Sequence, residues 1–243
     1  MAGAFAWGLL AASSLVIGAV VALSFKIGLR TIGLIMGFGA GVLISAVAFD
    51  LVEESAGLAS GHWPVVLGMF AGCAVFFVGD SVIDRSGGAD RKDATGAQES
   101  GTALAVVLGT VLDGIPESIV IGLTIYEGGA VGAAYLAAVF ISNLPESLSS
   151  SAGLATSGWS KARILWLWIG IALVSGLSSL AGYALFQHSS PNTVGFVLAF
   201  AGGAILTMLA DTMMPEAYEH GGRLVGVVTT IGFVVAFVIH TLD

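Results

Sequence analysis

The chain has 243 residues, of which 56 % are hydrophobic and only 10 % are charged, and its formal net charge is −8. Soluble domains carry about a quarter charged residues, so this composition excludes a soluble globular protein. The single cysteine, Cys73, also excludes an internal disulfide or a cysteine metal cluster. The 35 glycines lie mostly within apolar stretches, which is typical of closely packed membrane helices.

Eight stretches of the sequence are long and apolar enough to cross a bilayer as helices, which requires about 20 residues each. They are residues 4–25, 31–52, 64–83, 102–125, 130–155, 162–185, 192–217 and 224–242. The runs are continuous rather than alternating, which favours helices over a β-barrel. The first run has no basic residue before it, so we expect a span there and not a signal peptide. The sequence thus predicts an all-α integral membrane protein with one transmembrane domain, 1–243.

The basic residues predict the orientation of these spans. All eight follow the first, third, fifth or seventh span, at Lys26, Arg30, Arg85, Arg91, Lys92, Lys161, Arg163 and Arg223. With eight spans these connections share one side, which the positive-inside rule assigns to the cytoplasm. We therefore expect both termini outside, in a multi-pass protein of the cell (inner or plasma) membrane. The polar segment 84–101 is predicted to be a flexible cytoplasmic loop.

Carboxylates occur in the middle of the fourth and fifth spans. Asp113 and Glu117 are four residues apart, and Asn143 and Glu146 are three apart, so each pair shares one helix face. The short connection 127–129 makes the two spans antiparallel, so their midpoints can meet. Both midpoints also carry a proline, which frees a backbone carbonyl oxygen from its helical hydrogen bond.

An ionised carboxylate in the membrane interior costs at least a few kcal/mol, and no lysine or arginine lies in the middle of a span. The acids must therefore be protonated, with hydrogen bonds across the helix pair, or bind a cation. Their oxygens, with the Asn143 amide, the Ser142 hydroxyl and the freed carbonyls, form a donor set suited to a divalent ion.

Further acidic clusters end the second and seventh spans. They consist of Asp50, Glu53 and Glu54, and of Asp211, Glu216, Glu219 and His220. The predicted topology places the first cluster outside, as an entrance, and the second inside, as an exit. Related motifs on opposite faces indicate an inverted repeat of the first three and last three spans, a 3+2+3 arrangement. We expect His240 to be a solvated residue at the outer end of the last span.

Residues 113–118 (DGIPES) and 142–147 (SNLPES) resemble the paired Pro-Glu motifs of the ZIP family of zinc- and iron-permease-like divalent-metal transporters. The ends of the second and seventh spans, 50–55 and 211–217, are similar to other motifs of that family. The resemblance implies a metal centre in which Asp113 takes the place of a histidine. Glu117, Asn143 and Glu146 then match ligand positions, with Ser142 beside them, and a homodimer is expected.

The resemblance implies a permease that carries divalent metal ions, zinc first, into the cytoplasm by alternating access. The oxygen-rich site also suits Mn²⁺ or Fe²⁺. We expect no enzyme activity, no prosthetic group and no nucleic-acid partner. Two alternatives stay open. One is an intramembrane aspartyl hydrolase that pairs Asp113 with Asp80 or Asp211. The other is a proton-coupled carrier of a neutral or cationic organic solute.

Overall fold

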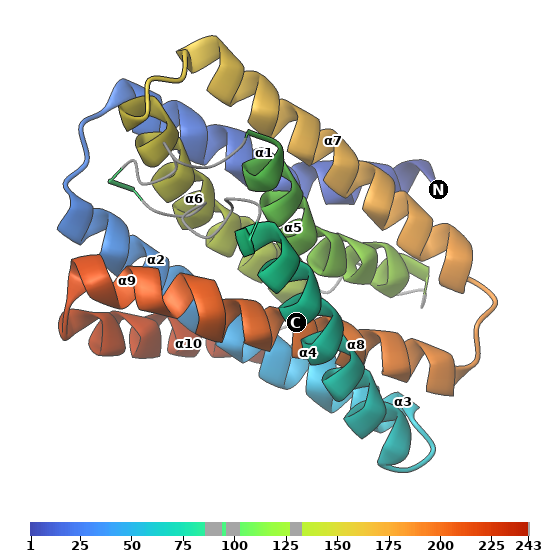
Figure 1. Cartoon of the computed structure of the whole chain (residues 1–243). Helices are drawn as coiled ribbons and strands as arrows, with labels where there is room; N and C mark the ends of the chain where they lie inside the picture. Colours follow the sequence, from blue (N-terminus) through green and yellow to red (C-terminus); the bar gives the residue numbers. More distant parts are fainter. Residues whose placement is uncertain (86–93, 96–102, 127–132, 243) are drawn as a thin grey trace.

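A computed structural model describes residues 1–85, 94–95, 103–126 and 133–242, and these residues contain helices but no strand (Figure 1). In chain order the helices are α1 (Ala2–Ser24), α2 (Leu29–Ala46), η1 (Val47–Glu53), α3 (Glu54–Leu58), α4 (Trp63–Ile83), α5 (Ala103–Tyr126), α6 (Ala133–Thr156), α7 (Lys161–Phe186), α8 (Pro191–Met208), η4 (Leu209–Met213), α9 (Met214–Gly221) and α10 (Leu224–Leu242). The described part of each of the eight stretches expected from the sequence is therefore almost entirely helical.

Seven helices in the described part of the chain are long and apolar enough to cross a membrane. They are α1, the continuous helix Leu29–Leu58, α4, α5, α7, the continuous helix Pro191–Gly221, and α10. The protein is thus an all-helical, multi-pass membrane protein, as predicted. Helix α6 is not among the seven, because its serines, asparagine and glutamate lower its hydropathy. The count of eight spans and the position of the termini remain predictions.

The second and seventh predicted spans are interrupted by π-helical turns, which the sequence did not indicate. Segment η1 lies between α2 and α3, and η4 lies between α8 and α9. Asp50 falls within η1 and Asp211 within η4. A π-helical turn changes which side of a helix the following residues face, and such turns are frequent at functional sites.

The helices fall into two groups, one formed by α1, α5, α6 and α7 and the other by α2, α4, α8 and α10, and the groups meet mainly where α2 packs on α6. In the first group α1 packs on α6 and α7, and α5 packs on α7; Figure 1 shows α1 and α7 running side by side. In the second group α2 packs on α10, and α8 packs on α4. The inverted repeat of the first three and last three spans remains a prediction.

Glycines allow the closest helix crossings in the second group. A Cβ atom added to Gly41 of α2 would overlap a backbone carbonyl of α10, and one added to Gly232 of α10 would overlap a carbonyl of α2. Gly203 of α8 and Gly72 of α4 make the same reciprocal contact. Lipid tails are as apolar as the helices, so this close packing, rather than the hydrophobic effect, holds the pairs together.

Polar side chains add hydrogen bonds between helices. Thr229 of α10 donates to the carbonyl of Gly37 at 2.9 Å, and Ser179 of α7 donates to that of Ala4 at 2.7 Å. Such bonds are worth about 0.6 kcal/mol each in membrane proteins, so they supplement the packing.

Two connections expected from the sequence fall largely outside the described residues. The segment 127–129 is not described at all, and only residues 84, 85, 94 and 95 of the predicted cytoplasmic loop are. Within that part, Ala94 is buried and its backbone N–H donates to Glu216 Oε1 of α9 at 3.3 Å.

Replacing Gly232 with alanine should destabilise the protein by about 1–3 kcal/mol, because the new methyl group must push α10 away from α2. The same substitution at Gly226, also in α10, meets no atom within 4 Å and should leave stability unchanged or raise it. Thermal unfolding of the two purified variants in detergent micelles compares them directly. Equal melting temperatures would show that the crossing tolerates a Cβ atom.

Candidate metal site

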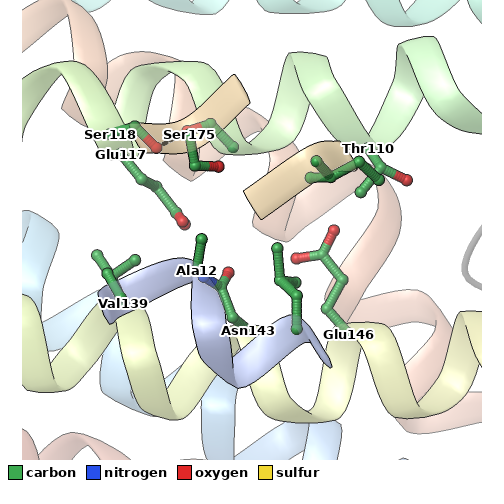
Figure 2. A pocket seen from close by; sticks show the side chains of 12 residues that line it. Ala12, Thr110, Glu117, Ser118, Val139, Asn143, Glu146 and Ser175 are labelled. Atoms are coloured by element: carbon green, nitrogen blue, oxygen red, sulfur yellow. Dashed lines mark hydrogen bonds between the residues drawn. The ribbon is translucent and has the colours of Figure 1, made fainter. Parts of the chain in front are cut away.

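A small pocket lies where α1, α5, α6 and α7 meet (Figure 2). Its wall is formed by Ala11, Ala12, Leu15, Thr110, Gly114, Glu117, Ser118, Val139, Asn143, Glu146, Ile171 and Ser175. The cavity measures about 10 Å³, which is room for the centre of one water-sized occupant. A metal ion that had kept its full hydration shell would not fit in this arrangement of the helices.

Two carboxylates enter the pocket from opposite walls. Glu117 comes from α5 and Glu146 from α6, and Figure 2 shows both side chains directed into the space between the helices. Asn143 lies between them on the α6 side, and Thr110 lies across the pocket from Glu146. The two glutamates are 3 % and 6 % exposed, so both carboxyl groups are withdrawn from solvent.

The helical repeat explains which residues reach the pocket. On α5 they are residues 110, 114, 117 and 118, and on α6 they are residues 139, 143 and 146. These spacings of three and four place each set on one helix face. Pro145 of α6 lies on another side, where a Cβ atom added to Gly39 of α2 would come within 2.8 Å of its ring.

Helices α1 and α7 contribute to the pocket in a way that the sequence analysis missed. That analysis placed the site between α5 and α6 alone, whereas α5 packs mainly on α7 and α6 mainly on α1. Ala11 and Ala12 of α1 leave room for the acidic side chains, and Ser175 of α7 adds a hydroxyl group. Small residues within an otherwise apolar helix are a weak signal of such contact, since they also serve ordinary helix packing.

Asp113 and Ser142 are buried but do not form part of the pocket wall. The Ser142 hydroxyl instead donates to the backbone carbonyl of Val139 at 3.0 Å. Within the described residues, no group of three or more His, Cys, Asp or Glu side chains is close enough to hold a metal ion. The pocket therefore presents two carboxylates, an amide and hydroxyl groups rather than the three-carboxylate cage expected from the sequence.

The predicted entrance cluster contains a partner that the sequence analysis did not assign. Asp50 Oδ1 lies 2.6 Å from Nδ1 of His240 in α10, and the imidazole stacks on Phe49 with the ring centres 5.5 Å apart. His240 is thus a paired residue, not the solvated helix-end residue that we expected. Glu53 is exposed and Glu54 half-buried.

The predicted exit cluster is divided between two places. Glu216 Oε1 of α9 lies 3.0 Å from His220 Nε2 and also accepts the Ala94 hydrogen bond, while Glu219 is exposed. Asp211 instead borders an apolar groove between α4 and α8. The π-helical turn η4 precedes α9, so Asp211 and Glu216 need not face the same way.

The pocket does not contain the aspartyl pair that a hydrolase would need. Among its described lining residues, neither Asp113 nor Asp80 nor Asp211 occurs. The pocket is lined by the buried oxygen atoms of carboxyl, amide and hydroxyl groups. Such a lining favours the binding of a proton or a cation over the binding of an anion.

Comparison with known proteins supports a transporter. Over 189 residues, or 77 % of its length, the chain is 27 % identical to an Arabidopsis thaliana protein named "Putative zinc transporter". The matched region is 30 % of that protein, so the chain spans about a third of its relative's length. No family model matches the chain.

Replacing Glu117 or Glu146 with glutamine should raise the melting temperature when no metal is present. Each change removes a desolvated acid from a pocket that holds another one, and glutamine keeps the shape and hydrogen-bonding capacity of the side chain. Differential scanning fluorimetry in detergent with a chelator present measures the shift. Asp80→Asn is the matched control, because Asp80 is equally buried but lies outside the pocket. A fall in the melting temperature of both glutamine variants would contradict this interpretation.

Proposed function

We propose that the protein is a divalent-metal transporter and that its substrate ion binds between Glu117 and Glu146. The observation that carries the proposal is the pair of buried glutamates facing one small pocket from opposite helices. The sequence has no lysine or arginine from residue 31 to 84 or from residue 93 to 160, so no basic side chain of these stretches balances the two acids. A divalent cation would balance both acids at once.

Two similarities support this function. The paired Pro-Glu motifs resemble those of the ZIP family, and the relative from Arabidopsis thaliana is named as a zinc transporter. Zinc is therefore the first candidate substrate. Asn143 supplies a third oxygen between the glutamates, and in the proposed transport cycle a movement of α5 or α6 adds Asp113 as a fourth donor.

The route that we propose begins at Asp50, Glu53 and Glu54, passes the pocket and leaves past Glu216 and His220, with Asp211 and Glu219 near the exit. The ion moves into the cytoplasm by alternating access, and both termini lie outside the plasma (inner) membrane. The small size of the pocket supports such a mechanism, because a cavity of about 10 Å³ admits a dehydrated ion but not a hydrated one. We further propose that the chain acts as a homodimer, with no prosthetic group.

Substituting glutamine for Glu117 or Glu146 should reduce metal uptake to background, because one of two charged ligands is lost. The measurement is the uptake of radioactive zinc into proteoliposomes that contain the purified protein. Asp80→Asn should transport at nearly the wild-type rate, since that carboxylate is buried elsewhere. Uptake that persists in both glutamine variants would rule out this pocket as the site.

The donor set also predicts the metal preference. Oxygen ligands discriminate poorly between Zn²⁺ and Mn²⁺, whereas imidazole suits zinc. Asn143→His should therefore increase the ratio of zinc to manganese uptake about tenfold, and Asn192→His, on the exposed start of α8, should not change it. An unchanged ratio in Asn143→His would show that residue 143 does not touch the ion.

A further inference from the structure

Tyr135 of α6 has an unusual environment for its hydroxyl group. The residue is 2 % exposed, and its oxygen is buried without a hydrogen-bond partner in the described structure. Buried hydroxyl groups are nearly always hydrogen-bonded, because leaving one unpaired costs free energy. A packing role would be served equally well by phenylalanine, so the hydroxyl itself requires an explanation.

The position of Tyr135 relates it to the pocket. Residues 135, 139, 143 and 146 follow one another at helical spacings of four, four and three, so Tyr135 shares the face of α6 that carries Val139, Asn143 and Glu146. It lies one turn, or about 6 Å along the axis, beyond Val139, which forms the pocket wall. Tyr135 is therefore next to the pocket, on the side of the α6 N-terminus.

Two carboxylates from other helices act electrostatically on this hydroxyl group. They are Glu117 of α5, which enters the pocket, and Asp50 of η1, which pairs with His240 at the predicted entrance. Helix α6 also packs directly on α2, which continues into η1, and on α10, which carries His240. The Tyr135 oxygen is thus within electrostatic range of both the entrance acid and a pocket acid.

We propose that the Tyr135 hydroxyl is a transient oxygen ligand for the divalent cation on its way from Asp50 to Glu117. This inference rests on the proposed transport function. A neutral hydroxyl oxygen can replace one water of a partly dehydrated ion without binding it as strongly as a carboxylate does. The ion can therefore move on to Glu117.

Tyr135→Phe tests the proposal, since it removes only the hydroxyl oxygen. Zinc and manganese uptake into proteoliposomes should fall about fivefold to tenfold at saturating metal, the effect of losing one polar contact. Equilibrium binding of zinc to the purified protein, measured by isothermal titration calorimetry, should stay within twofold of wild type. The melting temperature should not fall, because the oxygen removed has no partner in the fold.

Tyr183→Phe is the matched control, because this half-buried tyrosine of α7 lies outside the pocket wall. The inference is overturned if Tyr135→Phe transports at the wild-type rate, if its uptake falls only together with its melting temperature, or if Tyr183→Phe loses as much activity. Absence of uptake by the wild-type protein would instead overturn the proposed function, and this inference with it. Wild-type uptake with an unaffected Tyr135→Phe rejects the inference alone.

Discussion

The main physical constraint on this structure is the burial of two carboxyl groups inside an apolar bundle of helices. Glu117 and Glu146 are almost fully withdrawn from solvent, and neither sits beside a basic residue in its own helix. The membrane supplies no water to stabilise them, so their charge must be removed by a proton or balanced by a cation. This requirement connects the fold to the proposed function.

Close packing makes such a pocket possible. Reciprocal glycine contacts join α2 to α10 and α8 to α4, and small residues of α1 let α5 and α6 bring their acids into one cavity. The result is a cavity with room for little more than one small occupant. A site of this size favours an ion that has lost its water, and the protein oxygens must then replace that water.

Oxygen donors lie both outside the pocket and within it. Asp50 is held by His240 near the surface, Tyr135 follows next to the pocket, and Glu117 and Glu146 lie within it. The Asp50 side chain is 14 % exposed, whereas Tyr135, Glu117 and Glu146 are 2 %, 3 % and 6 % exposed. On the proposed route, an ion would exchange its water molecules for these protein oxygens one after another. Stepwise exchange avoids the large free-energy cost of losing all the water at once.

The sequence by itself determined the helical membrane fold, the position of the helices within a few residues, and the pairing of Glu117, Asn143 and Glu146 at mid-helix. These follow from hydropathy and from helical spacing, both of which act locally along the chain. Only the tertiary structure decided that α1 and α7 complete the pocket, that Asp113 and Ser142 lie outside its wall, and that His240 pairs with Asp50. Those outcomes depend on how separate helices are rotated and paired, and on the π-helical turns that shift their faces, which no local pattern of residues specifies.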